Sequence, residues 1–416
     1  MRMKTFWELY DFAIRQALKD DFDSVAAGEG YDPGHLDCLL HPDKHPLVIR
    51  TGECLCGPDE QESCAARCPF GAIKPSAEGG IEIDPELCVG CSDCIAGCQR
   101  ENLAPNTDVY PALKAVRSSR ENLAYALVAP AFLGQFGPSV TPGRLRSALK
   151  AAGFDGMIEV ALFADILTLK EALEFDENIR QEGDYQLTSC CCPMWIGMIR
   201  KIYSQLVPRV PGSVSPMVAC ARTIKKLYPG ALTVFIGPCL AKKAEAQEKD
   251  LAGDVDYVLT FQEVASIFRL LGIDPEAQEE DDKEHASRAG RIYARAGGVS
   301  EAVSATVARL NPARKIRVKT VKADGVPACK AMINDILSGE VKGNFYEGMG
   351  CKGGCVGGPR SVVPPDEGAR AVNAYGEQSP YETPAENPYV IELLHRLGYD
   401  RIEDLLRHSD IFTRTL

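Results

Sequence analysis

The chain has 416 residues and a formal net charge of −12, with 45% hydrophobic and 25% charged residues. The acidic balance argues against nucleic acid and against an anionic membrane surface as the main partner. The length favours two or more domains. The N-terminus has no export-signal pattern, and no apolar run reaches the roughly 18–20 residues of a membrane helix, so we expect a cytoplasmic protein.

Seventeen cysteines are the most informative feature of the composition. Nine of them fall between Cys38 and Cys98, and three are consecutive at positions 190–192. Neighbouring cysteines are poor disulfide formers, because their Cα separations and side-chain directions are unsuitable. In a chain expected in the cytoplasm, metal ligation is the better interpretation.

Residues 1–108 form the cysteine-rich region, which we expect to be a ferredoxin-like α+β domain with an N-terminal extension. The run Cys88-x2-Cys91-x2-Cys94-x3-Cys98 has the spacing of bacterial ferredoxins, in which three thiolates bind one [4Fe–4S] cluster and the fourth reaches another. A second set, Cys54-x-Cys56-x7-Cys64-x3-Cys68, precedes this run. If the last cysteine of each set binds the cluster of the other set, Cys68, Cys88, Cys91 and Cys94 bind one cluster, and Cys54, Cys56, Cys64 and Cys98 bind the other. Because the second set begins irregularly, Cys38 is an alternative to Cys54 or Cys56, and a zinc site is the alternative to a cluster.

Residues 120–360 alternate short β-rich apolar runs with amphipathic stretches, which is typical of an α/β domain with largely parallel sheets. Thr260 and Glu263 fit a capping box at the start of one helix. The acidic run 275–287 is interpreted as a solvated loop. Residues 361–416 are expected to be a tail that packs on this domain and ends in an amphipathic segment at 388–406. Strands are expected at 125–129, 231–236, 257–259 and 316–321, and helices at 164–178, 196–206, 261–271 and 326–338.

Three separated motifs carry the cysteines of this second region. They are Thr188-Ser-Cys-Cys-Cys-Pro-Met-Trp195, Gly237-Pro-Cys-Leu-Ala-Lys-Lys-Ala-Glu245 and Glu347-Gly-Met-Gly-Cys-Lys-Gly-Gly-Cys-Val-Gly-Gly358. Taken alone, they supply four thiolates: one from the triplet, Cys239, Cys351 and Cys355. Four thiolates from strand ends and glycine-rich loops suit one more [4Fe–4S] cluster.

In order and separation, these motifs resemble the signature loops of the catalytic domain of [FeFe]-hydrogenases, with supporting similarity from about Ala124 to Pro359. The resemblance implies a two-lobed α/β domain that holds an H-cluster, a [4Fe–4S] cubane joined through one cysteine to a diiron unit with CO, cyanide and azadithiolate ligands. It also implies roles for five residues: Cys355 as the bridging thiolate, Cys239 and Cys351 as cubane ligands, Lys242 as a hydrogen-bond donor to a cyanide, and Met349 beside the diiron unit.

The triple cysteine is similar to a variant of that family called group B, and it leaves the register of the first motif open. Anchoring on Pro193 makes Cys192 the fourth cubane ligand and Cys191 the proton-transferring thiol. We favour this register because Pro193 fixes the turn. Anchoring on the residues before the triplet shifts both roles back by one.

A Glu-x-x-Glu pair offers a path for protons beyond that thiol. Glu171 and Glu174 share a helix face at i, i+3 and match a pair seen in the family. The hypothesis is a relay of general acids and bases. An exposed acidic helix face is the alternative. The serine that links such a relay in common members has no secure counterpart in 211–216.

The leading functional hypothesis is an enzyme that interconverts H2 with protons and electrons, supplied through the two accessory [4Fe–4S] clusters. A low-turnover H2 sensor is the second hypothesis, although the tail of roughly 55 residues is short for a signalling domain. An iron–sulfur assembly scaffold without the diiron unit is the third, and such a scaffold needs neither Lys242 nor a cysteine beside the ligand. The expected partners are ferredoxin or a similar small electron carrier and the hydrogenase maturation proteins, with no nucleic acid and no membrane.

Overall fold

A four-stranded parallel sheet forms one half of the larger region. Its strand order is β6-β5-β8-β9, and every neighbouring pair is parallel. Side chains of the two central strands are buried almost throughout, as expected for a sheet covered by helices on both faces. The strands are β5 (Ala124–Val128), β6 (Gly156–Glu159), β8 (Leu232–Gly237) and β9 (Tyr257–Thr260).

A second parallel sheet has the order β10-β11-β7 and forms the other half. Its strands are β7 (Gln186–Leu187), β10 (Thr320–Asp324) and β11 (Phe345–Met349). The chain leaves β7, β8 and β11 directly into the three cysteine motifs. The carboxyl ends of strands in both sheets therefore supply the loops in which ligands bind in parallel α/β folds.

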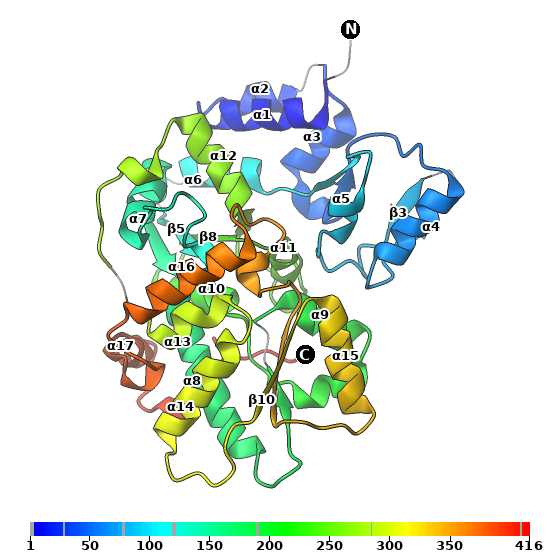
Figure 1. Ribbon diagram of the computed structural model, residues 1–416. Coiled ribbons are helices and arrows are strands. Elements are labelled where there is room, and N and C mark those ends of the chain that lie inside the picture. The colour runs from blue at the N-terminus through cyan, green and yellow to red at the C-terminus, as the bar shows by residue number, and fades with distance from the viewer. Residues whose placement is uncertain are drawn as a thin grey trace.

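Helices surround both sheets, which confirms the predicted α/β class. The capping box at Thr260 is also confirmed: Glu263 N–H donates to Thr260 Oγ1 (3.2 Å), and Thr260 N–H donates to Glu263 Oε2 (2.6 Å). Helix α8 is buried on most of its surface and packs against α10, α13 and α14 (Figure 1). The helices of this region are α7 (Pro142–Ala151), α8 (Ala161–Asn178), α9 (Pro193–Lys201), α10 (Pro216–Leu227), α11 (Ala241–Ala246), α12 (Phe261–Leu271), α13 (Arg288–Arg291), α14 (Gly298–Leu310) and α15 (Val326–Leu337).

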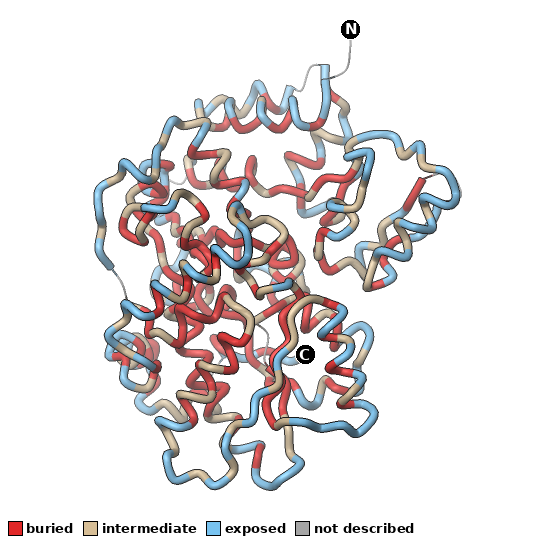
Figure 2. The backbone as a smooth tube through the Cα atoms, viewed as in Figure 1, coloured by how far each residue is buried: buried red, intermediate tan, exposed pale blue. Residues whose placement is uncertain are grey.

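The cysteine-rich region contains short helices and two antiparallel strand pairs, β1 with β4 and β2 with β3. The part with α4, α5 and β3 projects to one side of the molecule (Figure 1), and most of its residues are exposed or half-buried (Figure 2). Few apolar side chains are buried here, so bound clusters would add to a small hydrophobic core. The elements are α1 (Phe6–Ala17), α2 (Phe22–Ala27), α3 (Pro33–Leu40), β1 (Val48–Arg50), α4 (Pro58–Arg67), β2 (Ile73–Pro75), β3 (Ile81–Ile83), α5 (Asp93–Gly97), β4 (Leu103–Pro105) and α6 (Val109–Ser118).

The structure is a computed structural model, and it describes residues 4–27, 30–76, 80–118, 122–188, 191–283, 285–407 and 410–416. All cysteines in these ranges are free. Ser189 and Cys190, on which the alternative register of the first motif depends, lie outside them. None of the helices in these ranges combines the length and the hydropathy that a membrane crossing requires.

Three sequence-based expectations need correction. The strand expected at 316–321 begins at Thr320 instead, because it pairs in parallel with β11 along 320–324. The helix expected at 196–206 ends at Lys201, and a 3-10 turn containing Pro208 follows at Ser204–Arg209. The acidic run is not simply solvated, because the Arg146 guanidinium, itself buried, donates to the carbonyls of Asp281 and Lys283.

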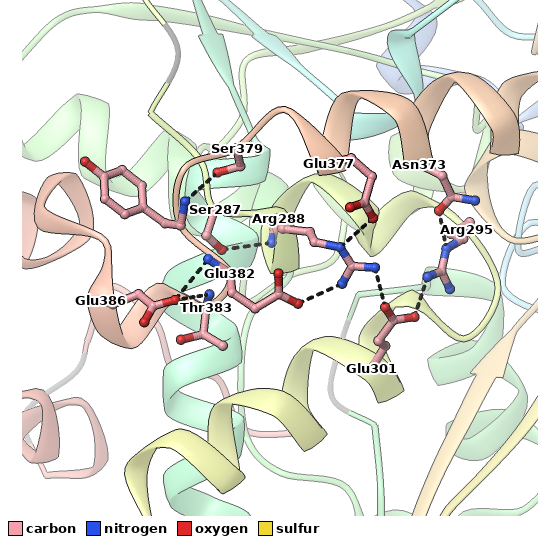
Figure 3. A network of polar contacts seen from close by, with 12 residues as sticks. Ser287, Arg288, Arg295, Glu301, Asn373, Glu377, Ser379, Glu382, Thr383 and Glu386 are labelled. Atoms are coloured by element: carbon pink, nitrogen blue, oxygen red, sulfur yellow. Dashed lines mark hydrogen bonds and ion pairs between the residues drawn. The ribbon is translucent and has the colours of Figure 1, made fainter.

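The C-terminal residues lie against α13 and α14. In a polar network, Arg288 pairs with Glu301 (2.7 Å), Glu377 (2.9 Å) and Glu382 (3.1 Å), while Arg295 contacts Glu301 and Asn373 (Figure 3). The amphipathic segment expected at 388–406 is a helix, α17 (Pro388–Arg396), followed by a 3-10 turn, η8 (Ile402–Leu406). Helix α16 (Pro365–Glu377) connects it to the last cysteine motif. The division into three domains at 108, 120 and 360 stays a prediction.

Candidate active site and cysteine clusters

One buried cavity lies where the loops after β7, β8 and β11 meet. Most of its lining consists of apolar side chains, prolines and glycines, among which a few reactive or polar side chains stand out. All three sequence motifs contribute to it, although they are more than 40 residues apart along the chain. The residues with reactive or polar side chains, together with two methionines, are Cys191, Cys192, Met217, Cys239, Lys242, Tyr293, Met349, Cys351 and Cys355.

The four thiols of the expected ligand set lie within electrostatic reach of one another. The pKa of Cys355 is raised to about 12, mainly by burial and also by the charges of Cys192 and Cys239. Burial likewise raises the pKa of Cys239 to about 11 with a contribution from Cys192, while Lys242 opposes the rise. Burial also raises the pKa of Cys351 well above its ordinary value, and the charges of Cys239, Cys192 and Cys355 add to the rise. Four thiols around one apolar space match the donor set of a [4Fe–4S] cubane.

Local backbone geometry holds two of these thiols. Cys192 is the N-cap residue of α9, with Pro193 at the first helical position, and its Sγ accepts a hydrogen bond from Gly350 N–H (3.3 Å). Gly354 has φ +84°, and a Cβ at this position would lie 2.6 Å from the backbone nitrogen of Ala296. Glycine is therefore required beside Cys355, because both the backbone angle and the close approach exclude a side chain.

Lys242 is buried at the wall of the cavity. Its ammonium donates to Glu245 Oε2 (2.6 Å), one turn along α11, and the Glu245 side chain is 2% exposed. Burial lowers the Lys242 pKa, but the Glu245 carboxylate, Cys239 and Cys355 together raise it by more, so the pKa lies above its ordinary value. The cavity therefore contains a permanent positive charge next to Cys239 and Cys355.

Cys191 lines the cavity, and Glu171 lies within electrostatic reach of its thiol. Burial raises its pKa well above the usual range, and Cys192, Glu171 and Cys355 add to the rise. Glu171 is 1% exposed on α8. Its carboxylate also adds to the raised pKa of Tyr293, which is caused mainly by burial. A carboxyl group therefore acts electrostatically on a thiol that lines the cavity beside the expected ligand set.

Glu174 lies one turn further along α8, and its side chain is 13% exposed. The interpretation of this pair as an exposed acidic face does not hold, because both carboxyl groups are largely buried. Glu174 Oε1 contacts the Lys170 ammonium, which also donates to Ser213 Oγ (2.8 Å). Burial raises the Glu174 pKa, and Lys170 opposes the rise.

The cysteines of the first region fall into two groups. Cys68, Cys88, Cys91 and Cys94 line a second cavity together with Phe70 and Val89. Burial raises the pKa values of Cys91 and Cys94 to about 12, with Cys68 contributing to both. The charge of Cys91 also adds to the raised pKa of Cys351. This group therefore lies next to the cavity lined by the three cysteine motifs.

The other group consists of Cys54, Cys56, Cys64 and Cys98. Burial raises the Cys64 pKa, and Cys98 and Cys54 raise it further. Burial raises the Cys56 pKa, and a hydrogen bond with Cys54 raises it further. Both groups are those given by the crossed ferredoxin spacing. Cys38 lies elsewhere, buried on α3 in the main apolar core, where burial and two aspartates raise its pKa.

Several residues of the site were not found from the sequence. Lys170, Ser213, Glu245 and Glu347 are buried, and each contacts an element that carries a predicted site residue. Glu347, for example, accepts hydrogen bonds from the backbone N–H groups of Gly297 and Ser300 (both 2.7 Å) and so ties β11 to α14. The spacings Lys170–Glu174 (i, i+4) and Lys242–Glu245 (i, i+3) were visible signals for two of them.

Comparisons with known proteins agree with this geometry. The family model described as "Iron only hydrogenase large subunit, C-terminal domain" matches residues 122–359, more than half of the chain. The chain belongs to this iron-only hydrogenase family. All three cysteine motifs, whose loops line the cavity described above, lie inside the matched residues.

Individual relatives divide into two functional kinds. The chain is 29% identical over 273 residues to "Iron hydrogenase 1" of Clostridium pasteurianum, an alignment that spans 56% of this chain and 47% of that protein. It is 23% identical over 350 residues to "Probable cytosolic Fe-S cluster assembly factor GF22738" of Drosophila ananassae, covering 68% and 73%. A solved structure of a variant of "[FeFe]-hydrogenase HydA1 from Chlamydomonas reinhardtii" superposes with a TM-score of 0.61 at 20% identity, covering 74% of this chain and 98% of that one. This last likeness establishes the fold alone.

Proposed function

We propose that this member of the iron-only hydrogenase family is an [FeFe]-hydrogenase that interconverts H2 with protons and electrons. The observation that carries the proposal is the set of residues that line the cavity between the three cysteine motifs. Beyond the four thiols that a cubane needs, the same cavity presents the Cys191 thiol, the Lys242 ammonium and Met349. Cluster binding alone gives no reason for a proton-carrying thiol and a buried ammonium at that place.

The donor set fits an H-cluster. Cys192, Cys239, Cys351 and Cys355 would hold the cubane, with Cys355 shared with the diiron unit. When bound, the H-cluster supplies the iron chemistry that makes and splits H2. Lys242, fixed by Glu245, would donate a charge-assisted hydrogen bond to an anionic ligand of the diiron unit, and Met349 would pack beside it.

Residues of the chain would carry the proton. Cys191 would accept or give a proton inside the cavity, and Glu171, whose charge acts on that thiol, would exchange it with Glu174. Burial raises the pKa values of Cys191 and Glu174, which favours their protonated forms.

Electrons would arrive through two [4Fe–4S] clusters. The set Cys68, Cys88, Cys91 and Cys94 adjoins Cys351 and would be the inner cluster. The set Cys54, Cys56, Cys64 and Cys98 belongs to the projecting part and would be the outer one. A ferredoxin or similar small carrier in the cytoplasm would exchange electrons with the outer cluster, and hydrogenase maturation proteins would install the diiron unit.

The similarity to cytosolic assembly factors supports a second candidate, an iron–sulfur scaffold. Such a protein would bind the cubanes and lack the diiron unit. The Cys191 thiol and the Lys242 ammonium favour the hydrogenase, because both line the cavity and neither is needed by a cubane that four other thiols would hold.

Infrared spectroscopy of the protein matured with hydrogenase maturation factors tests the proposal. Bands of metal-bound CO and cyanide are expected, together with H2 oxidation and evolution. The Lys242→Met variant should shift the cyanide bands or fail to retain the diiron unit. A fully cubane-loaded protein without these bands would refute the hydrogenase and favour the scaffold, and bands with negligible turnover would indicate an H2 sensor.

A further inference from the structure

Behind the expected proton relay, a lysine, a glutamate and a serine meet inside the protein. Lys170 is 3% exposed although it carries a charge. Its ammonium contacts Glu174 Oε1 and donates to Ser213 Oγ at 2.8 Å. A buried ammonium is expensive unless it is paired and hydrogen-bonded, and here both conditions are met inside one small cluster. We call Lys170, Glu174 and Ser213 the lysine triad.

Two independent segments fix the triad. Lys170 and Glu174 are four residues apart on α8, so their side chains meet on one face of the helix. Ser213 lies in the loop before α10, where it forms an antiparallel bridge with Thr413 of the C-terminal segment. Val214 N–H donates to Phe412 O (3.1 Å) on the same strand-like segment. The serine hydroxyl is therefore held by backbone pairing.

The arrangement uses one oxygen of Glu174 and leaves the other. Oε1 is bound by the ammonium, whereas Oε2 is buried and has no hydrogen-bond partner among the described residues. A proton that reaches Glu174 would therefore be taken up at Oε2. The lysine charge limits how strongly that proton is retained, because an adjacent cation stabilises the carboxylate against burial.

We propose that Lys170 is a positioning residue of the proton relay: anchored by Ser213, it binds one oxygen of the Glu174 carboxylate and keeps the second oxygen as the proton-accepting atom. The inference rests on the proposed function, in which Glu171 and Glu174 carry the protons of the H2 reaction.

Other charges act on the same carboxyl group. Glu177, one turn further on α8, raises the Glu174 pKa by repulsion. Outside it, Asp176 and Glu177 of α8 and Arg180 just after that helix line a groove together with Glu403 of η8 and Arg407, which follows it. These groups are at the surface and are screened by water and salt. Lys170 is therefore the dominant fixed charge at Glu174.

The test measures the protonation midpoint of Glu174 by infrared titration. The band of its protonated carboxyl group is identified in the whole protein by its loss in Glu174→Gln. In Lys170→Met the midpoint should rise by about 1–3 pH units, the usual effect of an adjacent cation, while Lys170→Arg should keep it near the wild-type value. The pH profile of H2 oxidation should move by the same amount. An unchanged midpoint, or a moved midpoint with an unchanged pH profile, would overturn the proposal.

Two controls separate this result from other failures. Arg370→Met breaks another i, i+4 pair, with Asp366 at 3.0 Å, which is exposed on α16, so it should leave both readouts unchanged. If Lys170→Met does not fold, Ser213→Ala takes its place and should raise the midpoint in the same direction by a smaller amount, with no rise counting against the triad. Absent CO and cyanide bands in the wild type would refute the hydrogenase, whereas the Glu174 midpoint still decides the role of Lys170.

Discussion

Single cysteines differ in what their loss should remove. Cys98 follows Cys94 in one ferredoxin run, but the structure groups it with Cys54, Cys56 and Cys64. We therefore expect Cys98→Ala to abolish the outer cluster and Cys68→Ala to abolish the inner one, each with a loss of about four iron atoms per chain. Iron analysis and electron paramagnetic resonance of the reduced protein measure both effects.

The matched control for these variants is Cys38→Ala, because Cys38 is the remaining cysteine of the first region and lies in the apolar core. It should keep the full iron content. If Cys98→Ala and Cys94→Ala removed the same resonance signal, the crossed assignment would be wrong.

The residues around the cavity show what a sequence can and cannot supply. The four thiols of the expected ligand set follow from their motifs, since cysteine spacing is a local property of the chain. Lys170 could not be given a role in the same way, because its significance depends on Ser213, which is 43 residues away along the chain. Contacts between distant segments leave no spacing pattern, whereas those within one helix do.

At the level of elements, α8 carries a buried acid whose titration should affect stability. Asp165 accepts hydrogen bonds from Ser287 N–H (2.6 Å) and from its hydroxyl. Burial raises its pKa to about 6, and the hydrogen bonds oppose the rise. The folded protein therefore binds this proton at a higher pH than the unfolded chain, where the pKa is about 3.9.

The sign of the effect follows from proton binding. Between about pH 4 and pH 6 the folded state holds more protons, so the free energy of unfolding falls as the pH rises through this window. From pH 5 to pH 8 the loss should be about 1.4 kcal/mol in the wild type. The loss is measured as a pH-dependent difference in thermal midpoint between the wild type and Asp165→Asn across that range. A difference that does not change with pH would contradict the assignment.

Elements also show why strand bounds shifted between sequence and structure. The run 316–321 has the apolar alternation of a strand, but its pairing partner β11 begins at Phe345 and aligns with Thr320. Alternation predicts that a strand exists, while its bounds are set by a partner that the local sequence does not contain. Helix α12 agreed to the residue because its capping box is local.

For the molecule as a whole, residues 410–416 tie separate parts of the site together. Arg414 pairs with Glu248 and Asp250 in the loop that follows α11, and Arg414 N–H donates to Gly212 O (3.0 Å) beside Ser213. Glu248 also pairs with Arg200 of α9, the helix that begins after Cys192. One arginine therefore joins the loops behind Lys242, Cys192 and Ser213.

We expect Arg414→Met to destabilise the protein by about 2 kcal/mol, seen as a lower midpoint of thermal unfolding. The arginine side chain is 2% exposed, so removing it takes a buried partner from two acids, but Glu248 keeps its pair with Arg200, and Asp250 is 44% exposed, so water compensates part of the loss. The control is Arg401→Met, which breaks an exposed pair with Glu403 and should cost under about 0.5 kcal/mol. Because Ser213 is bridged to Thr413, the Arg414→Met variant should also raise the infrared midpoint of Glu174 toward that of Ser213→Ala. Equal thermal midpoints for the two arginine variants would show that the C-terminal segment does not hold these loops.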